Sequence, residues 1–576
     1  LFNGSSQTID ETVYNLINLY VKHRMTKSNL KDVLIVINNM LPQPNFMPNT
    51  LHSLFSYVKN SVPHCIAIKH FYCKKCILYK GVDTVEVQCK SCSTSEKSYF
   101  FEIDIMEQIK CLFEYRNLAS LLKPFEKSHL NGESEIFSDI TDGSEYKRIN
   151  VRQNRGEYDL TLMLNTDGLS LTKSSKSNCW PLMFQIMELP PHLREQFIII
   201  SGLWYDNKKP VMNTFLHPFC LKLLKCFKDG INWLHPQTKV VYNTKIVVPL
   251  IIADAPARAQ ILNTCNFNGE YGCNICEIKT QKCLRIEGKK TVRIYPFIEH
   301  GCTLRTNKRM IKHSQIAFKQ NIDNIKGIKG PTIISTLPFL DLGTCVIPEY
   351  MHSVLLGIVK QFLNIWLHKD GSWNIKKYLN ETDNYLLQIK PPDTFSRLPR
   401  SLCLIHFYKA SEYYNWLLYY SIPTLKNYLP TQYFQHWLLL VMSIFILLKR
   451  EIKLLDIEEA EYMLKIFVKQ ILDLYNDREL RYNVHQLLHL GICVKRWGPL
   501  WATSAFPFED YNGKIASLSH ATKNIGQEII NNLSILDGLT ILKNKITFHK
   551  KQTVFVECLN KNISDSLLTE QDKRFL

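Results

Sequence analysis

The sequence predicts a mixed α/β core that is divided by a long helical segment and preceded by a small cysteine-rich module. Three observations lead to this prediction. Two Cys-x-x-Cys pairs lie close together near the start of the chain. Short apolar runs bounded by turn-like residues, the pattern typical of buried strands, occupy much of residues 158–254. Long stretches with helical periodicity then fill most of residues 349–476.

The bulk composition fits a large protein that acts on a polyanion. The chain has 576 residues and a formal net charge of +18. A chain of this length is expected to form roughly two to four domains. The basic excess favours nucleic acid as a partner, although a merely soluble basic protein has the same balance. The most apolar run, Trp437–Leu448, is too short to span a bilayer, so we expect no membrane partner.

Residues 61–105, which follow a helical region at 1–60, are expected to form a zinc-ribbon-like module. Its four cysteines have the spacing of one tetrahedral zinc site, and they are Cys73, Cys76, Cys89 and Cys92. Two pairs at this spacing are more typical of metal coordination than of redox chemistry. With eighteen cysteines in a chain of this size, the pattern fits a reducing compartment. The zinc could be purely structural.

Residues 158–278 are expected to form the first part of the core, after a helix and polar linker at 106–157. Three strand-like runs come first, at 160–165, 180–189 and 197–204, followed by a helical stretch at 211–227. An apolar run then ends at Asp254, and helical sequence begins at Pro256. Three hairpin-linked strands, a helix, a strand and a helix are the order of a ribonuclease-H-like core.

The second half of the chain is predicted to be a large insertion in that core. Residues 279–480 begin with a basic, irregular part and continue as long helices. The basic part could face DNA or be a solvated loop. Residues 481–545 would carry one helix with zinc ligands and one with a catalytic glutamate, followed by a C-terminal tail at 546–576.

Three acidic residues are candidates for a two-metal site. Asp167 and Asp254 follow predicted strands, and Glu509 lies on a late predicted helix. Carboxylates in this arrangement can hold two Mg²⁺ or Mn²⁺ ions for phosphodiester cleavage, with Asp167 bridging both ions. Each has a simpler alternative. Asp167 precedes Gly168 and could form a turn, and Asp254 could cap a helix. The adjacent Asp510 is an alternative to Glu509 as the third metal ligand, because neighbouring residues on a helix point in different directions and only one should face the metals.

A second zinc site is expected to connect distant parts of the chain. Cys273 and Cys276 form a third Cys-x-x-Cys pair, and His485 and His489 lie one helical turn apart. Histidines at i and i+4 share one helical face, as chelation requires. Four protein ligands would leave no position for water, so this zinc would be structural.

These residues resemble those of the transposases of CACTA (En/Spm-like) DNA transposons, over most of the chain. The wider order of acids, Cys-x-x-Cys and His pair is also similar to the Transib transposases and the V(D)J recombinase catalytic subunit. Beside the four-cysteine knuckle, the resemblance rests on Leu164–Gly168, Trp180–Pro181, Leu189–Pro191, Ala253–Arg258, Gly272–Cys276, Trp497–Trp501 and the span from His485 to Glu509.

The resemblance implies a ribonuclease-H-like DDE core that cleaves and joins DNA. It implies double-stranded DNA, both transposon terminal repeats and target DNA, as substrate, a homo-oligomer on DNA, and action in the nucleus. Two alternatives stand beside it. One is a catalytically inactive, host-adopted DNA-binding or regulatory protein, and the other is a nuclease without strand transfer. Because the chain begins with Leu1 rather than Met, we also expect upstream sequence.

Overall fold

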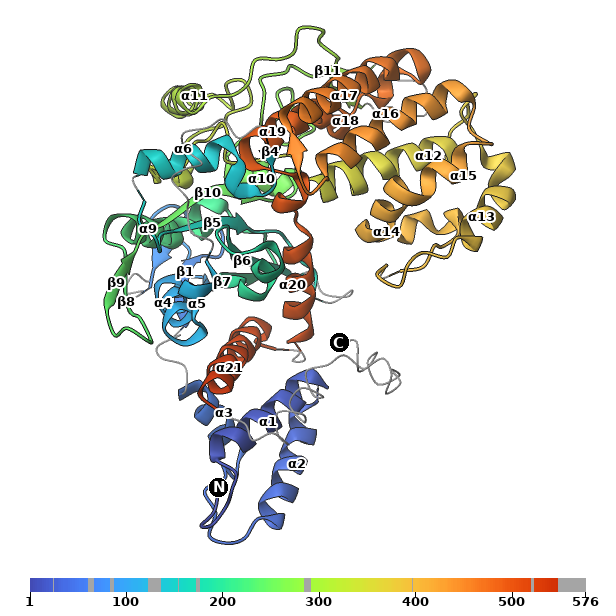
Figure 1. The fold of residues 1–576 in the computed structure, drawn as a ribbon. Helices are drawn as coiled ribbons and strands as arrows, with labels where there is room; N and C mark the ends of the chain where they lie inside the picture. The colour runs from blue at the N-terminus through green and yellow to red at the C-terminus, as the bar shows by residue number, and fades with distance from the viewer. Residues whose placement is uncertain are drawn as a thin grey trace.

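A computed structural model describes residues 1–546 except 24, 61–66, 83–87, 123–135, 154, 172–176, 284–291, 396 and 520–522. Apart from residue 546, the tail expected at 546–576 lies outside the described residues. Figure 1 shows a sheet with packed helices, a helical lobe on one side of it, and a smaller helical bundle that contains the chain start and the last helix.

The centre of the main sheet is formed by the apolar runs at 158–254. β5 (Leu160–Asn165), β6 (Asn178–Ile186) and β7 (Ile199–Asp206) are antiparallel neighbours, and β10 (Ile246–Ile252) lies parallel to β5. Every residue of β5 and β10 is buried, which explains their continuous apolar sequence. Parallel strands end at the same edge of a sheet, so Asp167 and Asp254 leave β5 and β10 on the same side.

The cysteine module does not stand apart from this sheet. β3 (Lys97–Ile103) pairs with β7, and β1 (Ala67–Cys73) and β2 (Tyr79–Gly81) continue the order to seven strands, β10-β5-β6-β7-β3-β1-β2. Tyr72 on β1 stacks on Trp204 of β7, with ring centroids 4.2 Å apart. The strands of the region expected as a separate zinc-ribbon-like module therefore share one hydrophobic core with the sheet.

Helices and a hairpin cover the sheet. α9 (His217–Lys228) packs on β10, and α4 (Ile105–Arg116) contacts β7 and the hairpin of β8 (Ile231–Leu234) and β9 (Val241–Thr244), which the sequence did not lead us to expect. α10 (Ala255–Ile261) begins directly after Asp254. The smaller elements nearby are α5 (Leu118–Leu121), β4 (Ile136–Phe137), η2 (Ile140–Asp142), α6 (Ser144–Gln153), α7 (Pro191–Arg194), η3 (Glu195–Phe197) and α8 (Met212–Phe215).

The basic segment after α10 returns to the sheet before the helical lobe begins. It contains β11 (Gln281–Lys282), β12 (Arg293–Ile294), α11 (Asn307–Lys319) and η4 (Ile333–Thr336). Near its end, Val346 forms a parallel bridge with Ile251 of β10, and the Ile251 N–H donates to the Cys345 carbonyl at 2.8 Å. Part of the range expected as an insertion thus extends the edge of the sheet.

Residues 351–474 form the helical lobe, which stands to one side of the sheet in Figure 1. Its interior is aromatic. Trp366 meets Trp437 edge-on at 4.9 Å, and Phe362 packs against Phe467 at 5.3 Å. The elements are the π-helices η5 (Met351–Val359) and η8 (Trp416–Tyr420), together with α12 (Lys360–His368), η6 (Lys376–Tyr378), α13 (Leu379–Gln388), η7 (Leu402–Phe407), α14 (Ala410–Asn415), α15 (Ser421–Leu425), α16 (Thr431–Leu447), β13 (Ile452–Lys453) and α17 (Leu454–Leu474).

The chain then runs back to the sheet through short helices. They are η9 (Asp477–Glu479), α18 (Tyr482–Gln486), η10 (Leu487–His489), α19 (Leu490–Trp497), η11 (Leu500–Thr503) and α20 (Phe506–Ser517). Trp497 donates from Nε1 to the Thr344 carbonyl at 3.0 Å, which ties α19 to the sheet edge. Gly498 has a φ of +79°, and a Cβ there would lie 2.2 Å from the Asp139 carbonyl oxygen. Only glycine fits this turn toward α20.

The last helix, α21 (Ile525–Lys545), packs with the start of the chain. α1 (Ile9–Lys22), α2 (Lys27–Met40) and α3 (Leu51–Asn60) form a second hydrophobic core with Ile535, Leu539 and Leu542 of α21. A capping box between Thr8 and Glu11 starts α1. Within the described parts of the chain, no helix combines the length and the apolar sequence needed to cross a membrane.

Candidate active site and metal centres

Two of the three predicted acids meet at the end of β5. Asp167 follows β5, and Glu509 lies in the first turn of α20, about 340 residues later in the sequence. One carboxylate oxygen of each, together with a ring nitrogen of His352, lie within 4.8 Å of one another. Asp510, the neighbour of Glu509, is not part of this group. The fold therefore joins a strand end, α20 and η5 at one point.

Asp254 lies beside this pair and also caps a helix. Its Oδ1 accepts the Ala257 N–H at 2.7 Å, so the capping alternative describes a real contact. Its charge nevertheless raises the pKa of both Asp167 and Glu509, which places it within electrostatic reach of both. The helix cap uses one carboxylate oxygen and leaves Oδ2 for another ligand.

His352 and Glu349 are the site residues that the sequence reasoning missed. Glu349 is buried, and its carboxylate accepts N–H bonds from Met351, His352 and Ala505 at 2.8 to 3.0 Å. It also contacts Nδ1 of His352 at 2.9 Å. Ala505 immediately precedes α20. One carboxylate thus fixes the His352 ring and the start of the helix that carries Glu509. The Glu-x-x-His spacing at the head of a predicted helix was the available signal.

Burial and mutual repulsion perturb these groups. Burial raises the pKa of Asp167 to about 7, and the charge of Asp254 adds to the rise. Burial also raises the pKa of Glu509. Burial alone would lower the pKa of His352, but Glu349, Asp167 and Glu509 together raise it to about 9. Carboxylates that repel one another in this way have the chemistry of a divalent-cation site, because a bound cation relieves the repulsion.

The ligands expected for the second zinc form one buried cluster of two thiols and two imidazoles, from Cys273, Cys276, His485 and His489. All four ligand atoms lie within 4.8 Å of one another. Cys276 Sγ lies 3.2 Å from His485 Nε2, and Cys273 Sγ lies 3.6 Å from His489 Nε2. Ligands bound to one tetrahedral zinc at its usual bond lengths are about 3.3–3.8 Å apart, so this cluster fits zinc. It connects α18 and η10 to the segment after α10.

The other four cysteines also come together. Cys73 Sγ lies 3.4 Å from Cys92 Sγ, and Cys76 Sγ lies 3.6 Å from Cys89 Sγ and 3.7 Å from Cys92 Sγ. These distances are far longer than a disulfide bond of about 2.05 Å and match sulfur atoms around one zinc. Burial opposes ionisation of Cys73, yet the backbone N–H groups of its knuckle lower its pKa to about 6. A thiolate is the form that binds zinc.

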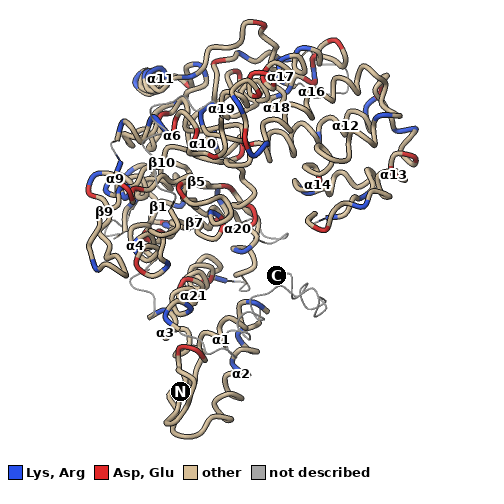
Figure 2. The backbone as a smooth tube through the Cα atoms, in the orientation of Figure 1, with Lys and Arg blue, Asp and Glu red and all other residues tan. Residues whose placement is uncertain are grey.

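The basic segment presents lysines on one helix face. Lys308, Lys312 and Lys319 of α11 are exposed and spaced at i, i+4 and i+11, which places them on one side of the helix. Figure 2 shows the cluster of Lys and Arg at α11 on the outside of the molecule. Three further basic residues of this segment, Arg285, Lys289 and Lys290, lie outside the described residues.

Comparison with known proteins bears on the first half of this site. Residues 135–327, about a third of the chain, match the family model described as "Transposase family tnp2". The matched segment contains Asp167, Asp254 and the Cys273–Cys276 pair, but it ends before His352. No curated protein matches the chain. The family match supports a transposase, an enzyme that binds and acts on DNA.

Proposed function

We propose that this protein is a CACTA-like DDE transposase, which cleaves transposon-end DNA and joins it to target DNA by a two-metal mechanism. The observation that carries the proposal is the meeting of Asp167 and Glu509 beside Asp254, three acids far apart in the sequence. The sheet order supports it, because three antiparallel strands with a parallel neighbour beside the first are what a ribonuclease-H-like core requires.

Asp167 would bind both metal ions, and Asp254 and Glu509 would each hold one. Two Mg²⁺ or Mn²⁺ ions held there would activate water, or the 3′-hydroxyl of the DNA, as the nucleophile and would stabilise the leaving oxygen. The protein's own part is positioning. The Ala257 N–H holds the Asp254 carboxylate, and Glu349 holds α20 so that Glu509 faces Asp167. His352, fixed by Glu349, contributes a ring nitrogen to the same group.

The two cysteine-containing clusters would hold structural zinc. The zinc bound by Cys273, Cys276, His485 and His489 would keep α18 and η10 on the core. It would thereby also help to position α20, which follows them in the chain. The four-cysteine cluster would stabilise the edge of the sheet at β1. The lysine face of α11 would contact phosphates of double-stranded DNA. We extend the proposal to a homo-oligomer that works on transposon ends in the nucleus.

A nicking assay tests the assignment. Glu509→Gln keeps the size of the side chain and removes a charged ligand, so cleavage of a duplex that carries the transposon's terminal repeat should fall by orders of magnitude in Mg²⁺ or Mn²⁺. DNA binding at fixed salt should persist, since it depends on Lys and Arg contacts. Asp510→Asn is the matched control and should cut normally. Equal cutting by wild type and Glu509→Gln would exclude this role, and a wild type that binds without cutting would favour the inactive, host-adopted alternative.

A further inference from the structure

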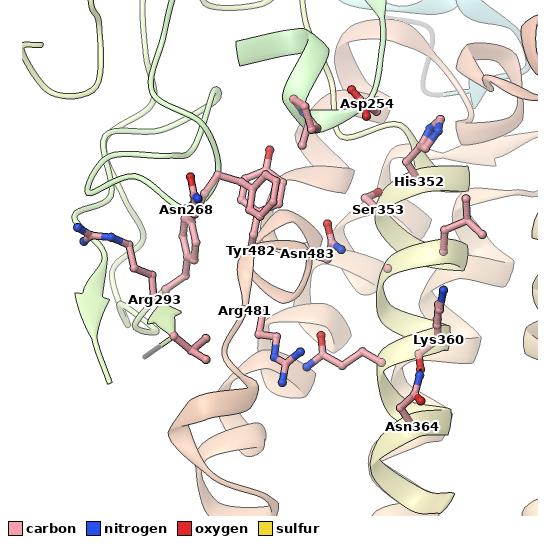
Figure 3. Close-up of a pocket in the computed structure, with 18 of the residues that line it drawn as sticks. Asp254, Asn268, Arg293, His352, Ser353, Lys360, Asn364, Arg481, Tyr482 and Asn483 are labelled. Carbon is pink, nitrogen blue, oxygen red and sulfur yellow. The ribbon is translucent and has the colours of Figure 1, made fainter. Parts of the chain in front are cut away.

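A cavity of about 800 Å³ is lined at one end by Asp254 and by His352, the histidine that lies with Asp167 and Glu509 (Figure 3). Asp254 and His352 lie at one end, and Lys360 and Asn364 on α12 lie toward the other. Its volume is in the range of pockets that bind a single small ligand. A double helix, whose major groove alone is about 12 Å wide, is too wide to enter a space of this size. A narrow, extended ligand can.

The lining of this cavity is cationic. Of the described residues that line it, Asp254 is the only acid, whereas Arg258, Arg293, Lys360, Lys369 and Arg481 carry positive charge. Lys369 and Arg481 are partly neutralised by Glu479, but Lys360 forms no ion pair among the described residues. A cation without an ion-pair partner, in a cavity that ends at Asp254 and His352, favours a ligand with a phosphate backbone.

The walls also offer contacts suited to bases. Phe267 is 39% exposed and lies 5.6 Å, centroid to centroid, from Tyr482, so an open aromatic face is available for stacking. Asn268 and Asn483 present side-chain amides that can bond to base edges, and Asn364 presents its amide oxygen, because its Nδ2 donates to the Lys360 carbonyl at 2.7 Å. Gly357 in η5 makes room for one of them, because a Cβ there would lie 2.4 Å from Asn483 Nδ2.

We propose that this cavity holds unpaired nucleotides of the DNA strand whose phosphate reaches the acids. The inference rests on the proposed function and adds a single-strand subsite to it. Phosphates contact Lys360 and its cationic neighbours, a base stacks on Phe267, and the strand passes Asp254 and His352 on its way to Asp167 and Glu509. A duplex must therefore open locally next to the cleavage position, since paired bases do not fit the cavity.

The first test measures binding of a fluorescent oligo(dT) of about 12 nucleotides, a length within the usual single-strand site sizes. Lys360→Ala should weaken binding roughly fivefold, and the slope of log affinity against log salt should fall in magnitude by about 0.7, the value for one lost single-strand phosphate contact. Lys376→Ala removes an exposed lysine on η6, outside the cavity, and should change neither quantity. Unchanged affinity and slope in Lys360→Ala would overturn the proposal.

The second test requires no variant. Oligo(dT) that contains 5-iododeoxyuridine should crosslink under ultraviolet light to Phe267, Tyr295 or Tyr482 in the intact protein, as located by mass spectrometry. Crosslinks found only on other parts of the chain would also overturn the proposal. The result is separable from the proposed function. Crosslinking in the cavity without duplex nicking would support the single-strand subsite and contradict the proposed enzymatic activity. Nicking without crosslinks in the cavity would support the activity and contradict the subsite.

Discussion

Asp167→Asn changes the charge of the candidate active site while hardly changing its shape. Asn keeps an oxygen that can accept the Gly168 N–H, which the Asp167 carboxylate accepts at 2.6 Å. What it removes is a carboxylate whose ionised form is disfavoured by burial first and then by the charges of Asp254 and Glu509. In protein without catalytic metal ions, ionisation of Asp167 should therefore cost stability, so the variant should be more stable than wild type at neutral and alkaline pH.

The magnitude follows from the pKa of Asp167, which rises from 3.8 to about 7 on folding. Because the folded-state pKa is the higher one, the associated stability is fully present below about pH 4 and is lost as the pH rises through 7. One pKa unit corresponds to about 1.4 kcal/mol, so the loss by pH 8 is at most about 4 kcal/mol. Because Asp167 shares its titration with the neighbouring acids, the loss that belongs to this residue alone is smaller than that upper bound.

Thermal unfolding at pH 4 and pH 8, in buffer freed of Mg²⁺ and Mn²⁺ but without a zinc chelator, measures this effect. We expect Asp167→Asn to melt above wild type at pH 8, by at most about 3 °C for a chain of 576 residues, and at the same temperature as wild type at pH 4. Added Mn²⁺ at a hundredfold excess over its Kd should stabilise the wild type by about 2.7 kcal/mol and so raise its melting temperature. The melting temperature of Asp167→Asn should hardly change. Asp510→Asn serves as the exposed control. Equal melting of wild type and Asp167→Asn at pH 8, or equal Mn²⁺ responses, would refute the reasoning.

Two further predictions concern the two zinc sites and the buried Glu349. Elemental analysis should find about two zinc ions per chain, and Cys276→Ser and Cys76→Ser should each lose one, because each site needs four ligands; an unchanged zinc content in both variants would contradict this. Glu349→Gln replaces one accepting oxygen by an amide donor, which then opposes either the Met351 and Ala505 N–H groups at Oε1 or the His352 N–H at Oε2, and this should cost about 1–3 kcal/mol of stability. Its nicking activity should fall more than its DNA affinity does, whereas Glu381→Gln, at an exposed position on α13, should match wild type in melting and in nicking.

The sequence by itself determined the elements whose signals are local. β5 and β10 could be recognised as buried strands because a strand covered on both faces needs an unbroken apolar run. The lobe helices α16 and α17 were visible in their periodicity. The clustering within Cys73–Cys76 and within His485–His489 was also expected, since a spacing of three or four residues fixes the distance between ligands on a knuckle or on one helical turn.

Only the tertiary structure decided which distant segments meet. No local pattern announces that Val346 pairs with Ile251, or that the cysteine strands join β7 through β3. The position of His352 beside Asp167 depends on Glu349 accepting N–H bonds from two helix starts at once, a contact between residues 349 and 505 that has no periodic trace. Side-chain spacing is encoded within a turn of helix or a strand, whereas the meeting of Asp167, His352 and Glu509 results from the packing of the whole core around them.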